Sequence, residues 1–138
     1  EPTMKTLIFI LFFIIPFNVN SNDNISNFLQ KYKWISQDKG ESYFILEFKN
    51  NKVIKNFYIL KELIDKEEYS IVKKYFKNNQ LFLLLRFINK IDDKTESYEI
   101  YHYFWGISKL SSKEIVIFSS DFPKNNEEPY KEIFEIYN

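Results

Sequence analysis

The residues best suited to chemistry lie in one aromatic stretch, residues 97–107. It contains His102, the only His of the chain, and one of the two Trp. A single His acts as a metal ligand or a general base only where other groups converge on it. No spaced cluster of His, Cys or carboxylates accompanies it. We therefore interpret His102 as a structural or surface residue and predict no metal site.

The only Arg of the chain, Arg86, lies in the preceding apolar stretch. Its guanidinium could neutralise a carboxylate of a small ligand, because Arg pairs with carboxylates through two parallel hydrogen bonds. The alternative is a surface ion pair with a residue such as Glu99. The carboxylate pairs at 92–93 and 127–128 would act as acid and base only if folding joined them in a cleft. No Ser has the context of a hydrolase nucleophile, so we predict no catalysis and no cofactor.

The stretches that carry His102 and Arg86 predict two neighbouring strands. Residues 80–89 and 97–107 are rich in residues that suit a pleated surface, and both faces of each are largely apolar. If Asn89 pairs with Ser97, then Leu83 lies opposite Tyr103 in the core. The same register places Leu84 opposite His102 and Arg86 opposite Ile100 on the second face.

This second face is the predicted binding surface. A small barrel has only one interior, and an exposed apolar patch above a few hundred Å² usually marks an interaction site. The partner would be an apolar small molecule or a protein. The side chains assigned to the surface are Phe82, Leu84, Arg86, Ile100, His102 and Phe104.

Periodicity and turn residues divide the rest of the chain into short elements. Residues 24–31 have the spacing of a short helix. Asn-Asn pairs and Gly40 mark turns, because Asn and Gly tolerate positive φ. The further predicted strands are residues 32–36, 43–49, 53–60, 114–119 and 130–137, the last of which also has the spacing of a helix.

Residues 61–79 fit either a helix or a strand. Residues 65–68 resemble a helix cap, and Ile71 and Tyr75 have helical spacing. Residues 69–76 also alternate between two faces, and a turn of the hairpin type follows at 77–79. We favour a strand over 69–76. The alternative is an α+β fold with a helix at 61–77, which would suit a secreted inhibitor or immunity-type interaction protein.

Residues 1–21 are predicted to be a secretory signal peptide with a short N-terminal extension. Lys5 precedes an apolar run at 7–17, and Val19 and Ser21 occupy the positions that a signal peptidase reads. The run is shorter than the roughly 20 residues needed to span a bilayer. We therefore expect no stable membrane anchor after cleavage and a single secreted or periplasmic domain at 22–138. Asn24 begins a glycosylation sequon that a eukaryotic secretory pathway could use.

Composition excludes some partners. The 19 basic residues balance the 19 acidic ones, whereas nucleic-acid binders normally have a basic excess. The chain has no Cys, so packing rather than disulfides must stabilise it. Its aromatic content of 20% accompanies an absence of Ala that is typical of AT-rich coding. The aromatic residues alone therefore do not indicate a ligand pocket.

Eight short strands joined by tight turns are typical of an up-and-down meander that closes into a barrel. Three stretches also resemble the small secreted lipocalin-like proteins of the calycin group. These are the helix that leads into Tyr32-Lys33-Trp34, residues 69–81, and residues 104–118. Lipocalins have Gly-x-Trp at the first position, where this chain has Tyr32. The resemblance implies a barrel that holds a small apolar ligand or fills its own interior.

We therefore expect a mainly β protein. Its fold would be an antiparallel meander or small eight-stranded barrel with a short N-terminal helix. Its function would be that of an exported binding protein, with no catalysis.

Overall fold

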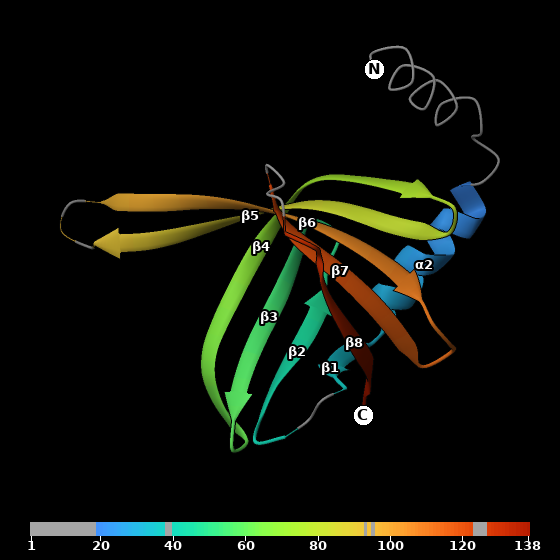
Figure 1. Ribbon diagram of the computed structural model, residues 1–138, viewed down its shortest axis with the longest axis horizontal. Helices are drawn as coiled ribbons and strands as arrows, with labels where there is room; N and C mark the ends of the chain where they lie inside the picture. The colour runs from blue at the N-terminus through green and yellow to red at the C-terminus, as the bar shows by residue number, and fades with distance from the viewer. Residues whose placement is uncertain (1–18, 38–39, 93, 95, 123–126) are drawn as a thin grey trace, which may run out of the picture.

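A computed structural model describes residues 19–37, 40–92, 94, 96–122 and 127–138. Within these residues the chain forms one helix and a closed barrel of eight antiparallel strands in sequence order (Figure 1). The predicted barrel with a short N-terminal helix is therefore confirmed. The elements are α2 (Val19–Lys31), β1 (Lys33–Ser36), β2 (Ser42–Phe48), β3 (Lys52–Ile59), β4 (Glu62–Lys77), β5 (Gln80–Asp92), β6 (Ser97–Lys109), β7 (Glu114–Phe122) and β8 (Tyr130–Tyr137).

The ambiguous stretch is a strand, so the alternative of a helix at 61–77 and an α+β fold is wrong. β4 runs over 16 residues. Leu60 and Lys61 both have positive φ, which reverses the chain directly after β3. Residues from Glu62 onward then pair with β3, and this pairing overrides the local helical spacing. At the other end of β4, Asn78 and Asn79 have positive φ and form the predicted hairpin turn.

The register of β5 and β6 differs by two residues from the predicted one. Asn89 lies opposite Glu99, and Leu83 lies opposite Trp105. β5 continues to Asp92, past its predicted end at Asn89, with an irregularity between Lys90 and Asp92, and β6 begins at Ser97 as predicted. A shift of two residues leaves each side chain on its predicted face. The predicted faces are therefore correct, and the predicted partners are not.

Trp34 fills the barrel interior at the end that α2 covers. It is fully buried, and its Nε1 donates a hydrogen bond to the carbonyl of Leu29 at 3.0 Å. Phe28 and Tyr32 meet its ring edge to face. The helix is thereby attached to the barrel by one buried hydrogen bond and a small aromatic cluster.

The predicted signal peptide falls mostly on residues 1–18, which lie outside the described residues. The described helix α2 spans the predicted cleavage position at residue 21. Among the helices of the described residues, none is long and apolar enough to cross a membrane. Export and cleavage remain predictions.

The distal halves of β5 and β6 leave the barrel as a two-stranded ribbon. β5 pairs with β4 no further than Arg86, and β6 pairs with β7 no further than His102. Beyond these positions the two strands pair only with each other and project to the left in Figure 1. We call residues 87–92 and 97–101 the arm.

Candidate functional site

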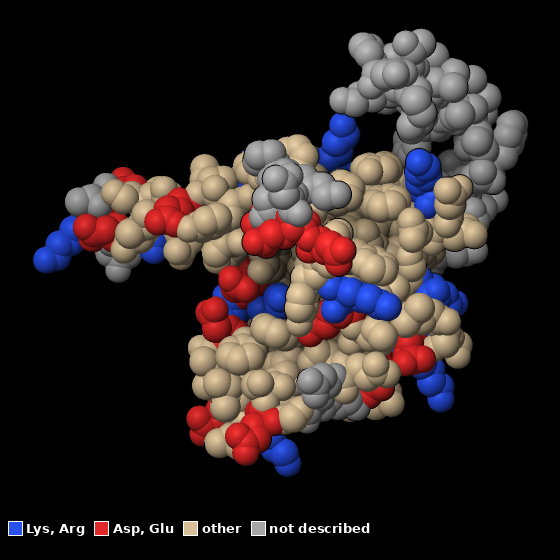
Figure 2. Space-filling model, in the orientation of Figure 1, with Lys and Arg blue, Asp and Glu red and all other residues tan. Residues whose placement is uncertain are grey.

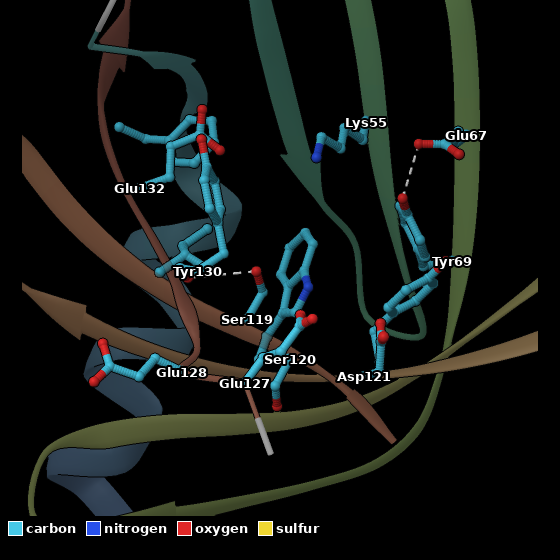
Figure 3. A pocket seen from close by; sticks show the side chains of 14 residues that line it. Lys55, Glu67, Tyr69, Ser119, Ser120, Asp121, Glu127, Glu128, Tyr130 and Glu132 are labelled. Atoms are coloured by element: carbon cyan, nitrogen blue, oxygen red, sulfur yellow. Dashed lines mark hydrogen bonds between the residues drawn. The ribbon is translucent and has the colours of Figure 1, made fainter. Parts of the chain in front are cut away.

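The barrel opens at the end away from Trp34 into a pocket of about 380 Å³, the mouth pocket (Figure 3). Along β7, buried Ile115 is followed by Ile117 and Ser119, which line the pocket. The strand alternation that fills the core therefore also builds the pocket wall. Its lining residues are Lys55, Glu67, Tyr69, Tyr103, Trp105, Ile117, Ser119, Ser120, Asp121, Glu127, Glu128, Tyr130, Glu132 and Phe134.

The floor of the mouth pocket is aromatic. Tyr69, Trp105 and Phe134 are buried, and the ring centroid of Tyr69 lies 5.8 Å from those of Tyr103 and Trp105. These residues come from β4, β6 and β8, which converge only when the barrel closes. The packed rings offer a rigid apolar surface to a ligand.

The rim of the mouth pocket is acidic. Among the described residues, five carboxylates line it, against one cation, Lys55. Lys55 extends over the ring of Phe44, with its Nζ 4.1 Å from the ring centroid. Figure 2 shows acidic side chains gathered near the middle of the view, over the start of β8. The carboxylates are Glu67, Asp121, Glu127, Glu128 and Glu132.

The titration behaviour of the lining residues reflects burial and this negative charge. The hydroxyl of Tyr69 donates to Oε1 of Glu67 at 2.9 Å. Burial is the largest cause that raises the pKa of Tyr69, and the hydrogen bond to Glu67 and the charge of Glu67 raise it further. Burial, and then the charges of Glu67 and Asp121, raise the pKa of Tyr103. Burial raises the pKa of Glu132, and the positive charge of Lys55 partly offsets this increase. The carboxylates therefore act on groups at the floor as well as at the rim.

The carboxylates do not converge on a single point. Among the described residues, no three His, Cys, Asp or Glu side chains are close enough to hold a metal ion together. In Figure 3, Glu67 and Glu132 flank the pocket on separate strands. The carboxylates therefore surround the mouth pocket from several sides and do not form a single ligand cluster.

The six residues of the predicted binding surface share the outer face of β5 and β6, outside the mouth pocket. Leu84 lies opposite Phe104, and Arg86 opposite His102, in place of the predicted partners. The predicted ion pair of Arg86 with Glu99 does not form, because Glu99 lies opposite Asn89 on the other face of the arm. The surface is thus one continuous face, as expected, but it is not part of the pocket.

The aromatic residues of this outer face cover one another. The ring centroid of Phe82 lies 5.0 Å from that of Tyr75 and 5.8 Å from that of Phe104, and the rings are stacked. Phe82 also lies over Gly106, where an added Cβ would come within 3.2 Å of Phe82 Cε1. Phe82 and Phe104 are half-buried in this cluster, whereas Ile100 on the arm is 58% exposed. The open part of the predicted surface is therefore Ile100 on the arm and Arg86 directly before it.

The structure places Asp92 apart from Glu127 and Glu128, the carboxylates considered above as acid and base. Asp92 lies near the arm tip, where its carboxylate accepts a hydrogen bond from the amide of Lys94 at 2.9 Å. Its neighbour at position 93 lies outside the described residues. Glu127 and Glu128 line the mouth pocket instead.

We did not predict the mouth pocket from the sequence, although one signal for it was present. Lys55 lies between Val53 and Phe57 on the inward face of β3, and Glu132 precedes inward-facing Phe134 on β8. A charge at an inward position of a barrel strand indicates a polar cavity. This signal is readable only after the strands are known to form a barrel.

No protein-family model matches the sequence, and no curated protein matches it. Among solved structures, the fold is similar to the crystal structure of pallilysin (Tp0751) from Treponema pallidum. The TM-score is 0.52 at 10% sequence identity, over 81% of this chain and 82% of that chain. At this identity the likeness concerns the fold alone. The lipocalin-like resemblance drawn from the sequence therefore holds at the level of a small antiparallel barrel.

Proposed function

We propose that this protein is an exported, non-catalytic binding protein that holds a small organic cation in the mouth pocket. The observation that carries the proposal is the pocket lining, with an aromatic floor below a rim of five carboxylates and one Lys. Export is supported by the apolar run at residues 7–17 and its flanking residues.

Electrostatics favours a cation over the other ligand classes. Carboxylates attract an ammonium group, and aromatic faces attract it further. Within the described part of the lining, an anion would face five carboxylates, with Lys55 as its one cationic partner. A wholly apolar ligand would strip water from the carboxylates without replacing their hydrogen bonds. The apolar ligand expected from the sequence is thereby narrowed to one with a cationic head and an apolar or aromatic body.

The experiment compares three probes that differ in their head group: phenethylamine, 2-phenylethanol and 3-phenylpropanoate. Isothermal titration calorimetry measures the affinities. We expect phenethylamine to bind most tightly, the alcohol more weakly and the anion not at all. Equal or tighter binding of the alcohol or the anion would show that the rim does not select a cation.

Two variants locate the binding. Glu132→Gln removes one rim charge at nearly constant shape, and we expect the affinity for phenethylamine to fall about tenfold, equivalent to about 1.4 kcal/mol. Glu41→Gln makes the same change at an exposed residue outside the mouth pocket. It should leave the affinity unchanged. An equal loss in both variants would indicate a general charge effect and contradict the assigned site.

A further inference from the structure

Among the described residues, the arm leaves a fork between β4 and β5 in which neither strand edge pairs with a further strand. The two strands pair only from Ser70–Arg86 to Lys77–Gln80. Before Ser70, β4 pairs with β3 alone, and beyond Arg86, β5 pairs with β6 alone (Figure 1). We call residues 62–69 the β4 edge and residues 87–92 the β5 edge.

Backbone groups of both edges are directed toward the fork. The amide of Ile71 donates to the carbonyl of Asn51 at 2.9 Å, on the β3 side. Successive residues of a strand direct their amides to opposite neighbours, so the amides of Ser70 and Glu68 face the β5 side. Because Ser70 pairs with Arg86, the amide of Ile88, two residues further, faces the β4 side. Such edges are templates for pairing with another strand.

The β4 edge is strongly acidic, whereas β5 carries one cation within its edge and a second directly before it. The β4 edge contains four acidic residues and one Lys. The β5 edge contains Lys90 and Asp92, and Arg86 directly precedes it. Arg86 forms no ion pair within the part of the chain that the structure describes.

Both edges also expose apolar side chains. Large apolar residues between 49% and 58% exposed lie on the β4 edge and along the arm. An isolated two-stranded ribbon is at best marginally stable in water, so the arm requires a further strand or surface to cover it. The exposed residues are Leu63, Ile64, Ile88, Ile91, Tyr98 and Ile100.

We propose that the protein forms a symmetric dimer in which the β5 edge of each copy pairs with the β4 edge of the other. Within one chain the two edges diverge from the fork, as Figure 1 shows. Each edge can therefore pair with the opposite edge of a second copy. The arrangement is self-complementary, as a two-fold dimer requires, because the same two edges meet at both contacts. Continuing the Ser70–Arg86 register places Glu68 opposite Ile88 of the second copy.

Cysteine cross-linking tests this register, because the chain has no Cys of its own. Glu68→Cys and Ile88→Cys are prepared separately, mixed and oxidised, both positions being exposed. Directly opposed residues lie about 5.5 Å apart between Cα atoms, within the range of a disulfide. We expect a covalent dimer that contains one chain of each variant, identified by mass spectrometry.

A matched pair, Glu41→Cys with Ile88→Cys, measures random cross-linking, because Glu41 is exposed and lies on neither edge. A yield no higher than in this pair would overturn the proposal. A double variant that carries both Glu68→Cys and Ile88→Cys distinguishes a second possibility. If it forms only a monomer with an internal disulfide, the arm closes on its own β4 edge and the dimer is wrong.

Sedimentation equilibrium provides a second test. Ile88→Pro removes the amide that faces the fork, and Pro is tolerated where a strand amide faces solvent. We expect a dimer for the natural chain and for Ile88→Val, and a folded monomer by circular dichroism for Ile88→Pro. A natural chain that is monomeric at every accessible concentration would refute the dimer. If Ile88→Pro does not fold, the cross-linking experiment decides.

Discussion

Replacing Trp34 by Phe tests how the helix end of the barrel is held. Trp34 is 0% exposed, and its Nε1 donates to the Leu29 carbonyl at 3.0 Å. Phe keeps most of the apolar surface and removes this donor. The carbonyl, in the last turns of α2, loses a buried partner at a cost of about 1–3 kcal/mol. The smaller ring leaves a gap worth about 1 kcal/mol more.

We therefore expect Trp34→Phe to lower the free energy of unfolding by about 2–4 kcal/mol, a large part of the 5–15 kcal/mol typical of a domain. Urea unfolding followed by circular dichroism measures this value. Trp105→Phe is the matched control, because Trp105 is 6% exposed but lines an existing pocket. We expect it to cost about 1 kcal/mol. An equal loss in both variants would refute the role given to the Trp34 hydrogen bond.

Four further predictions concern other parts of the molecule. Trp105→Ala removes most of the pocket floor and should cost about 3–5 kcal/mol in urea melts, more than any single loop substitution; a loss below about 1 kcal/mol would place the ring at the surface. Burial raises the pKa of Glu132, so its ionised form destabilises the folded state above that pKa. Glu132→Gln should therefore raise the free energy of unfolding at neutral pH, and the gain should vanish in acid, below the ordinary pKa of Glu; a gain that persists in acid would contradict this cause. Gly106→Ala should destabilise by about 1 kcal/mol, because its Cβ meets the Phe82 ring, and Phe82→Leu should relieve that loss in a double-mutant cycle. The intact mass of the exported protein should lack the residues through about Ser21, whereas a membrane-bound product that retains residues 7–17 would indicate an anchor.

Local patterns were sufficient to predict the strands and their faces. Alternation in residues 80–89 identified β5, and the Asn pair at 78–79 identified its hairpin turn. The register of β6 could not be predicted, because it depends on the irregularity between Lys90 and Asp92. The length of β4 was also missed, since the turn at Leu60 and Lys61 uses residues that rarely adopt positive φ.

The candidate site depended on closure of the barrel. Glu67, Tyr103 and Glu132 lie on β4, β6 and β8, and no sequence spacing indicates that they surround one volume. The predicted outer surface was correct as a face, because the alternation of a strand fixes which residues share a side. The sequence could not show that this face divides into a packed cluster around Phe82 and an exposed arm. That division depends on where β4 and β7 stop pairing with β5 and β6.

Intermolecular nuclear Overhauser effects with bound phenethylamine locate the cation that we propose for the mouth pocket. The phenyl protons should show contacts to the indole of Trp105 and the ring of Tyr69, which form the pocket floor. They should show none to Trp34, at the far end of the barrel. Contacts confined to the outer face around Phe104, or no contact to Trp105, would contradict the assignment of the site.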